Sequence, residues 1–310
     1  MHKLTRKKIS FNTAAPSKRC MLGITLALLS AAASGFSVVI IGKHSKKSTP
    51  FNVSVLISAV GLIILWPLAF ALTDFAATNL EGIALFALGG LLTPGLVRLL
   101  YYTGLAKLGA SVNSSIFSVY PLYSALLAML FLSEILTPQN WVGVISIVLG
   151  VILVEFTSRK TNKSGKSMRK NLVFPIFGGL ALGISAILRK TALEIFNAPI
   201  LGVTVAYTFS FLIYAVMLAV SKSTRKDLSL RQDLRLFWVA GVGQALSWIF
   251  SFYALSVEKV SIVTPLLSVE PIFVVLLAYL YLRGTEHVSL KLVASIILTV
   301  FGVILVTTAT

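Results

Sequence analysis

The 310-residue chain has little of what a soluble enzyme normally carries. It has one cysteine, three histidines and 12% charged residues, whereas an average soluble domain has about 25% charged residues. Because Cys20 is the only cysteine, a scaffold held by internal disulfides is excluded. The low charge leaves too little polar surface to cover a water-soluble globule of this length. A hydrophobic content of 57% excludes a disordered chain.

Sequence signals for enzymatic chemistry are also lacking. His2, His44 and His287 lie outside the apolar runs, and there is no Cys/His cluster, Walker loop or paired-carboxylate pattern. We therefore expect no enzymatic activity, no metal site and no cofactor. The net charge of +17 comes from basic residues at the ends of apolar runs and in short loops. This placement favours orientation at a membrane surface over binding of nucleic acid.

Long apolar runs account for about two thirds of the chain. A helix needs about 20 mostly apolar residues to cross the hydrocarbon core of a bilayer. The runs predict ten spans, at 20–41, 53–72, 82–104, 112–132, 138–156, 172–193, 198–220, 236–257, 260–282 and 288–308. They are too long and too apolar for barrel strands. We expect an all-α, multi-pass integral membrane protein, with the lipid bilayer as its environment and the plasma membrane as its location.

The sequence contains an internal repeat. Ser118-Val119-Tyr120-Pro121 reappears 150 residues later as Ser268-Val269-Glu270-Pro271, and 8 of 15 positions are identical between 118–132 and 268–282. Further along, Glu134 matches Glu286, and the last span of each half contains Gly-Val-Ile-Leu-Val. A looser match joins Gly35-Phe36-Ser37 to Gly183-Ile184-Ser185. The ordered series of matches predicts two related halves.

The repeat predicts a division of the chain into four parts. These are a basic N-terminal tail at 1–19, a five-span repeat at 20–157, a basic linker at 158–170 and a second five-span repeat at 171–310. Because five is odd, the second repeat enters the membrane from the opposite side. Inverted repeats are a recurrent transporter design, with the substrate site near mid-membrane at the interface between the repeats.

Several of these segments resemble the drug/metabolite transporter superfamily, EamA type. The resemblance rests on Ala-Ser-Gly-Phe-Ser (33–37), Leu-Tyr-Tyr-Thr-Gly-Leu (100–105), the Ser-Val-Tyr-Pro segment (118–128) with Ser-Glu (133–134), Phe-Tyr-Ala-Leu (252–255) and Leu-Ser-Val-Glu-Pro-Ile-Phe (267–273). It implies a ten-helix secondary transporter with a central cavity, which often moves amino acids or other small metabolites. It also implies that a glutamate before the second-half proline is usual, whereas Arg98 departs from the pattern.

The loop charges and the N-terminal tail point to opposite orientations. We count 17 basic residues on the side reached after the first span and 9 on the other side, which includes the tail, Arg189, Lys190 and Lys259. The positive-inside rule then places both termini outside. The basic tail and the family resemblance place them in the cytoplasm. Ten spans put both termini on the same side in either case.

Two charged residues fall well inside predicted spans. Glu270 lies about ten residues into the ninth span, and Arg98 lies about 16 residues into the third. A charge there costs about 2.5–3.5 kcal/mol on insertion scales, so each needs a polar surrounding. Glu270 is a candidate for binding a substrate amine or a coupling proton, and Arg98 for holding a carboxylate or phosphate. The alternative is that the two form a structural pair.

Prolines and polar or aromatic residues near these charges complete the candidate site. Pro121 and Pro271 are hinge candidates at equivalent positions, and Pro94 is a third that lies one turn before Arg98. The other substrate-binding candidates are Tyr120, Ser118, Ser268, Tyr102, Gln244 and Trp248. The alternative for each aromatic residue is simple packing between helices.

Two functions are compatible with these features. The first is a secondary active transporter that works by alternating access on small organic metabolites, with amino acids as one candidate class and export or exchange as the direction. The second is a channel-like or non-transporting membrane scaffold that keeps the repeat architecture. The expected partners are a small-molecule substrate, the bilayer and a coupling proton. The sequence carries no signal for oligomeric state.

Overall fold

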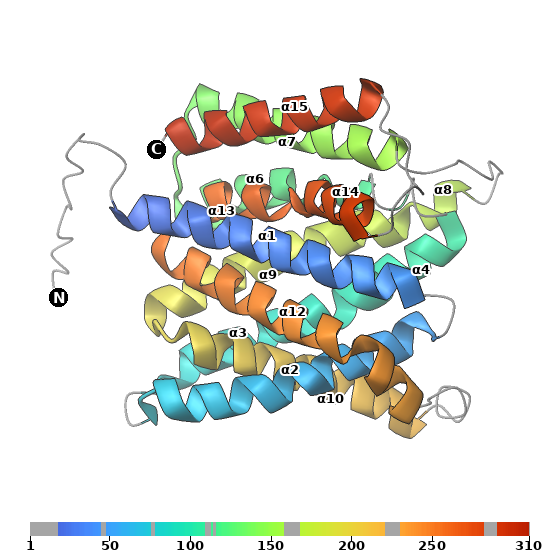
Figure 1. The fold of residues 1–310 in the computed structure, drawn as a ribbon. Coiled ribbons are helices and arrows are strands. Elements are labelled where there is room, and N and C mark those ends of the chain that lie inside the picture. Colours follow the sequence, from blue (N-terminus) through green and yellow to red (C-terminus); the bar gives the residue numbers. More distant parts are fainter. Residues whose placement is uncertain are drawn as a thin grey trace, which may run out of the picture.

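The computed structural model describes residues 18–44, 48–75, 78–108, 113, 116–157, 168–220, 230–281 and 290–309. Their elements are α1 (Lys18–His44), α2 (Pro50–Leu72), α3 (Leu80–Gly90), the π-helical segment η3 (Leu91–Leu96), α4 (Val97–Leu108), α6 (Tyr120–Leu132), α7 (Pro138–Thr157), α8 (Met168–Asn171), α9 (Val173–Ile195), α10 (Pro199–Val220), α12 (Leu230–Val257), α13 (Val260–Leu267), α14 (Glu270–Tyr281) and α15 (Leu290–Thr308). Most of the basic tail and most of the linker lie outside the described residues. Within the described ranges the fold is all-α (Figure 1).

The expected membrane spans are present. Among the described residues, seven helical stretches are long and apolar enough to cross a bilayer, and three shorter apolar helices correspond to the fourth, fifth and tenth predicted spans. Large apolar side chains such as Leu130, Ile63 and Phe70 are 76%, 73% and 67% exposed on the outside of the bundle. Such an apolar outer surface suits lipid rather than water. The protein is therefore a multi-pass integral membrane protein.

Within the described residues, three of the predicted spans are interrupted, each next to one of the prolines named as hinge candidates. The third span bends at Thr93, whose φ of −140° and ψ of 119° are not helical. In the ninth span, α13 ends at Leu267 and α14 begins at Glu270, with a turn between them. In the fourth span, a turn at 118–119 precedes α6. Pro121 and Pro271 thus lie in the first turn of a helix, where a missing N–H costs little.

The two halves pack through equivalent contacts. Helix α1 packs against α12 as α9 packs against α3, and α1 packs against α14 as α9 packs against α6. Helices α2 and α10 contact each other, as do α7 and α15. Helix α1 begins and α15 ends at the same end of the bundle, on the left of Figure 1. Each contact between a helix of one half and a helix of the other thus has an equivalent with the halves exchanged, as expected for two inverted five-helix repeats.

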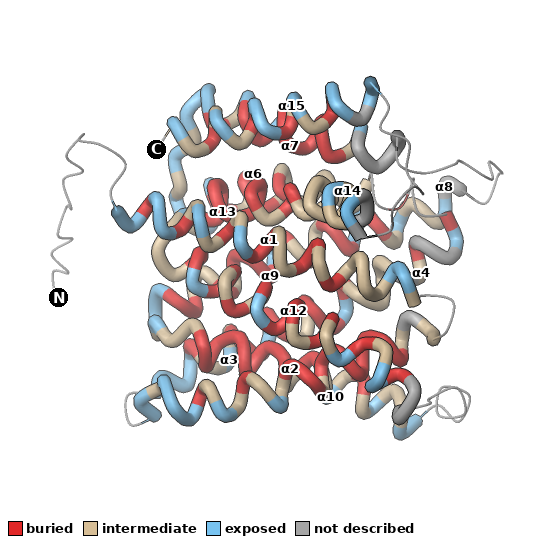
Figure 2. The backbone as a smooth tube through the Cα atoms, in the orientation of Figure 1, coloured by how far each residue is buried: buried red, intermediate tan, exposed pale blue. Residues whose placement is uncertain are grey.

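Small residues allow close helix contacts in the interior. A Cβ added to Gly302 of α15 would lie 2.6 Å from the carbonyl oxygen of Gly143 of α7. Only glycine at both positions lets these two backbones approach so closely. Serine pairs reinforce other contacts, since the Ser30 hydroxyl donates to the Ser247 carbonyl at 2.7 Å and joins α1 to α12. Buried residues, red in Figure 2, accordingly line the contacts between helices.

Candidate functional site

A polar cluster surrounds Glu270 at the break in the ninth span. The Ser34 hydroxyl of α1 donates to Oε2 of Glu270 at 2.6 Å, and the Gln244 side-chain amide of α12 donates to the same hydroxyl at 3.1 Å. Glu270 is the first residue of α14, where the helix dipole stabilises a carboxylate. Three helices from both halves therefore meet at one acidic group inside the membrane.

The approach of α1 to this acid depends on a glycine. A Cβ added at Gly35 would lie 2.8 Å from Cβ of Phe273 and 3.3 Å from the carbonyl oxygen of Glu270. Gly35 therefore lets α1 pack directly on the first turn of α14, which brings Ser34 within hydrogen-bond distance of the carboxylate. The repeated Gly-x-Ser motif had singled out this glycine, but not the serine before it.

The repeat partner of Glu270 is Tyr120, and it reaches the same region from the other half. Its hydroxyl donates to the Thr264 carbonyl of α13 at 3.1 Å. Tyr120 also lies within electrostatic range of both Glu270 and Arg189. Ser268 is buried and donates to the carbonyl of Pro265 at 2.7 Å, and Ser118 lies in the turn before α6. The serine hydroxyl at 268 thus stabilises the helix break itself.

Arg189 is a buried cation that the sequence reasoning assigned to a loop. It lies within α9 and is 3% exposed, and its Nε donates to the Ser185 carbonyl at 3.2 Å. Its guanidinium carbon lies 5.0 Å from the ring centroid of Trp248 and 5.6 Å from that of Phe252. Arg189 therefore does not belong among the nine basic residues counted on the side of the N-terminal tail, because it lies inside the bundle. The sequence contains one signal for this burial, because Arg189 lies four residues before the end of the predicted span 172–193.

Arg98 and Pro94 make their hydrogen bonds with α2 and α10. Arg98 of α4 donates to the Ser58 hydroxyl of α2 at 3.4 Å and interacts with Tyr207. Pro94 lies in η3, and its carbonyl accepts a 2.8 Å hydrogen bond from Tyr214. Tyr102 lies in α4, but its side chain is outside the described residues. The structure thus gathers Glu270, Tyr120, Gln244 and Trp248, and gives Arg98 contacts on α2 and α10.

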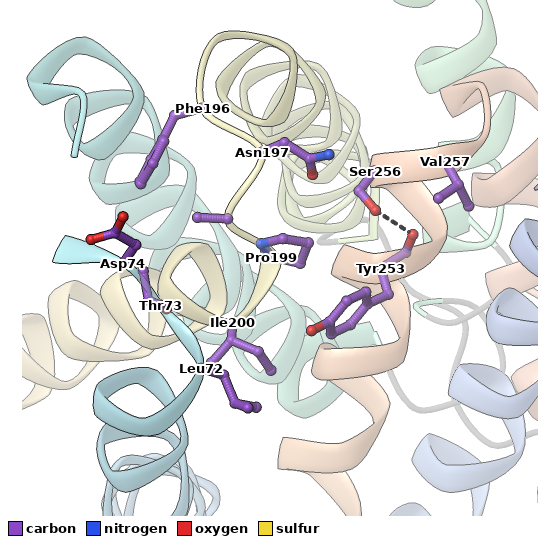
Figure 3. Close-up of a pocket in the computed structure, with 11 residues that line it drawn as sticks. Leu72, Thr73, Asp74, Phe196, Asn197, Pro199, Ile200, Tyr253, Ser256 and Val257 are labelled. Carbon is purple, nitrogen blue, oxygen red and sulfur yellow. Dashed lines mark hydrogen bonds between the residues drawn. The ribbon is translucent and has the colours of Figure 1, made fainter. Parts of the chain in front are cut away.

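A pocket of about 540 Å³ lies at the end of the bundle where α1 begins (Figure 3). Its lining comes from the end of α2, the α9–α10 connection and the end of α12, and comprises Leu72, Thr73, Asp74, Phe196, Asn197, Ala198, Pro199, Ile200, Tyr253, Ser256 and Val257. It lies between the two halves but contains none of the residues bonded to Glu270. Phe196 is seven residues beyond Arg189, or about 10 Å along α9. We place the candidate site at the polar cluster, because it holds the acid inside the ninth span, and the buried Arg189 lies against Trp248, four residues beyond Gln244 of the cluster.

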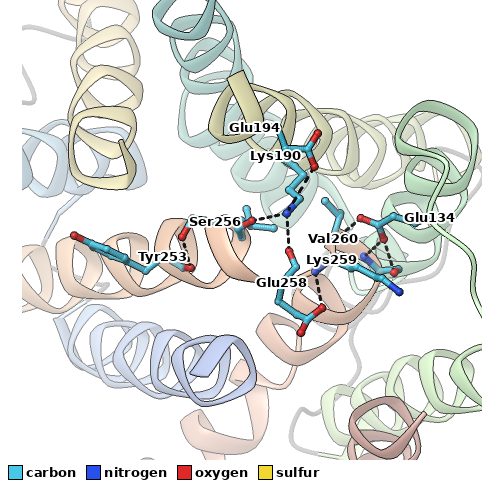
Figure 4. A network of polar contacts seen from close by, with 10 residues as sticks. Glu134, Lys190, Glu194, Tyr253, Ser256, Glu258, Lys259 and Val260 are labelled. Carbon is cyan, nitrogen blue, oxygen red and sulfur yellow. Dashed lines mark hydrogen bonds and ion pairs between the residues drawn. The ribbon is translucent and has the colours of Figure 1, made fainter. Parts of the chain in front are cut away.

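Polar contacts close the same end of the bundle around α13 (Figure 4). Glu134, from the connection between α6 and α7, accepts hydrogen bonds from the backbone N–H groups of Val260 and Ser261 at 2.8 and 3.0 Å. Lys190 donates to the Leu255 and Glu258 carbonyls at 2.9 and 3.0 Å. Both side chains satisfy helix-end groups that would otherwise lack partners. Glu134 thereby joins the first half to the second.

The cluster has the chemistry of a binding site for a polar solute. A carboxylate accepts hydrogen bonds from an ammonium group or takes up a proton, and a buried guanidinium donates to an anion. Among the described residues, no three His, Cys, Asp or Glu side chains gather as metal ligands.

Comparisons with known proteins agree with this architecture. Among the solved structures that match is a crystal structure with a TM-score of 0.75 at 13% identity, over 93% of this chain and 96% of the other, which is a likeness of fold. "Uncharacterized transporter YwfM" of Bacillus subtilis (strain 168) is 27% identical over 139 residues, 44% of this chain and 47% of that protein. The EamA-like transporter family matches residues 21–156 and 170–308, one match for each half. The chain spans about half the length of that relative, and it belongs to the EamA-like transporter family, whose model matches both of its halves.

Proposed function

We propose that the protein is a secondary active transporter that moves small organic metabolites across the plasma membrane by alternating access. Amino acids are the favoured substrate class, and export or exchange is the favoured direction. The two five-helix halves, 20–157 and 171–310, are the bodies that rock against each other. The observation that carries the proposal is the bonded group of Ser34, Glu270 and Gln244, where helices of both halves meet at a helix break.

Glu270 is the central group in this proposal. A carboxylate at the start of a half-helix, inside the membrane and bonded to a serine hydroxyl, accepts either a substrate ammonium group or a proton. Binding of a cation or a proton to Glu270 changes the charge at the junction between the halves. Such a change is suited to couple the occupancy of the site to the relative position of the two halves. Pro121 and Pro271 flank the two breaks and are the proposed hinges, with Pro94 at the third. The remaining proposed site residues are Arg98, Tyr120, Ser118, Ser268, Tyr102 and Trp248.

The test is counterflow in vesicles reconstituted with purified protein. Radiolabelled amino acids are offered outside, with and without unlabelled amino acid inside, and with and without a pH gradient. The proposal expects saturable uptake that internal substrate accelerates, and a proton-coupled mechanism expects the gradient to change it. Flux that rises linearly with concentration would instead indicate a channel, and no flux above protein-free vesicles would indicate a scaffold.

A further inference from the structure

Arg189 presents a buried positive charge that the described residues leave without a carboxylate partner. It is 3% exposed within α9, and no carboxylate within the described residues forms an ion pair with it. An isolated charge inside a membrane protein is costly, and a buried cation is normally paired. The two aromatic rings of Trp248 and Phe252 compensate part of this cost through cation–π contacts.

The guanidinium group retains hydrogen-bonding capacity. It carries five N–H donors in a planar fork that matches a carboxylate. Within the described part of the chain, the hydrogen bond it makes is that from Nε to the Ser185 carbonyl at 3.2 Å. Ser185 in turn donates to the Gly89 carbonyl at 3.0 Å, which fixes the base of the arginine side chain against α3. These contacts thus hold the Nε end of the guanidinium, and its terminal NH₂ groups keep N–H donors for a ligand.

Helix α12 connects this cation to the acidic cluster. Trp248, which lies against Arg189, is four residues after Gln244, which is bonded through Ser34 to Glu270. Residues i and i+4 share one face of a helix and lie about 6 Å apart along it. The cation and the acid therefore flank the same face of α12, about one turn apart. Tyr120 lies within electrostatic range of both.

We propose that Arg189 binds the carboxylate of the transported solute while Glu270 binds its ammonium group, so that the site selects zwitterions that carry both groups on one carbon atom. This inference rests on the proposed transport function and adds a residue and a selectivity to it. The aromatic rings of Trp248 and Phe252 keep the guanidinium in place when the site is empty. Removal of the solute carboxylate then costs affinity, whereas a change in an uncharged part of the solute costs less.

A structural role for Arg189 makes a different prediction. If the arginine only joins α9 to α12 by stacking on the two rings, its replacement lowers stability and weakens every ligand by the same factor. The ratio between the affinity for an acid and for its amide then stays constant. That ratio is therefore the readout that separates binding from packing.

The experiment measures binding by calorimetry to the purified full chain in detergent. The probes are common L-α-amino acids and, for each, its primary amide, which keeps the ammonium group and removes the negative charge. We expect wild-type protein to bind at least one amino acid about ten-fold or more tightly than its amide, as for a charge-assisted hydrogen bond. In Arg189→Gln this preference falls to about one, while the amide still binds. Lys259→Gln, which removes an exposed cation at the start of α13, keeps the wild-type ratio.

Several outcomes overturn the inference. They are equal binding of acid and amide by wild-type protein, no binding of any amino acid, and an unchanged preference in Arg189→Gln. If that variant does not fold, Arg189→Lys is measured instead, because lysine keeps the positive charge but lacks the planar fork of N–H donors. An acid-to-amide affinity ratio between one and the wild-type value supports the inference. A ratio equal to that of wild type contradicts it. Counterflow separates the two proposals. A carboxylate preference without transport refutes the transport function alone, and saturable transport without the preference refutes the role of Arg189 alone.

Discussion

At the residue scale, the features that point to function are charges that lipid does not tolerate. Glu270 was predictable, because an acid ten residues inside an apolar run needs a polar surrounding wherever the helices lie. Its partner Ser34 was not, because a serine in an apolar helix has no distinctive pattern, and the contact joins residues 236 positions apart. Arg189 was missed because Arg and Lys near a span end usually extend their charge to the membrane surface.

Neutralising Glu270 tests its role directly. In Glu270→Gln we expect counterflow to fall by about 10- to 100-fold, the effect of losing a hydrogen bond to a charged group. The chromatographic profile and melting temperature remain near wild type, because the amide is isosteric and still accepts from Ser34. Glu81→Gln is the matched control, since Glu81 is an exposed acid in the first turn of α3. Wild-type transport by Glu270→Gln would remove this acid from the mechanism.

At the element scale, the broken helices are the main addition to what the sequence predicts. Prolines indicated where the chain bends, but the pattern did not distinguish a kinked helix from two helices with a turn between them. Whether the helix kinks or breaks depends on tertiary contacts. Here the Ser268 hydroxyl donates to the Pro265 carbonyl, and Tyr120 donates to the Thr264 carbonyl. The serine provides a partner for a backbone oxygen at the break, and Tyr120 adds a second hydrogen bond to a carbonyl that also accepts from the Ser268 N–H.

Replacing the proline at the second break tests its role as a hinge. In Pro271→Ala we expect the exchange rate to fall by about ten-fold, a barrier increase of ~1.4 kcal/mol, while equilibrium binding changes little. The reason is that alanine allows α13 and α14 to join into a stiffer helix. Pro67→Ala within α2 serves as the comparison, because that proline lies away from the three breaks. Equal rates for Pro271→Ala and wild type would show that the proline is only a static packing element.

The contact of Glu134 with α13 predicts an effect on stability. Glu134→Gln weakens the hydrogen bonds to two backbone N–H groups at the start of α13, so we expect a loss of about 1–2 kcal/mol in free energy of unfolding. Glu194→Gln should change stability by about 0.5 kcal/mol or less, because it removes a 3.8 Å ion pair to Lys190 whose acid is half exposed. Thermal melting in detergent compares the two. Equal melting temperatures would show that Glu134 does not cap α13 in solution.

At the scale of the whole molecule, the repeat predicted the architecture almost completely. Ten apolar runs and matched Ser-Val-x-Pro segments imply two inverted five-helix halves, and the helix contacts follow that symmetry. The sequence did not predict which faces meet. That depends on glycines such as Gly143 and Gly302, whose role is apparent only when both helices are in place.

The contact between α7 and α15 is the clearest packing test of this arrangement. Gly302→Ala places a Cβ 2.6 Å from the Gly143 carbonyl oxygen, so the helices must separate, and we expect a loss of about 1–3 kcal/mol in stability. Gly42→Ala is the control, because no atom lies within 4 Å of its added Cβ. That change should stabilise the end of α1 by about 0.5–1 kcal/mol. A Gly302→Ala protein as stable as wild type would contradict the close α7–α15 contact.

The most direct test of alternating access is the accessibility of the polar cluster from each side of the membrane. Ser34→Cys, in a chain whose buried Cys20 is replaced by alanine, is treated in oriented vesicles with a membrane-impermeant thiol reagent applied to one side at a time. Alternating access predicts that the thiol is labelled from each side, and that an unlabelled transported amino acid slows labelling from both. Labelling from one side only, whatever the substrate and gradient, would contradict it.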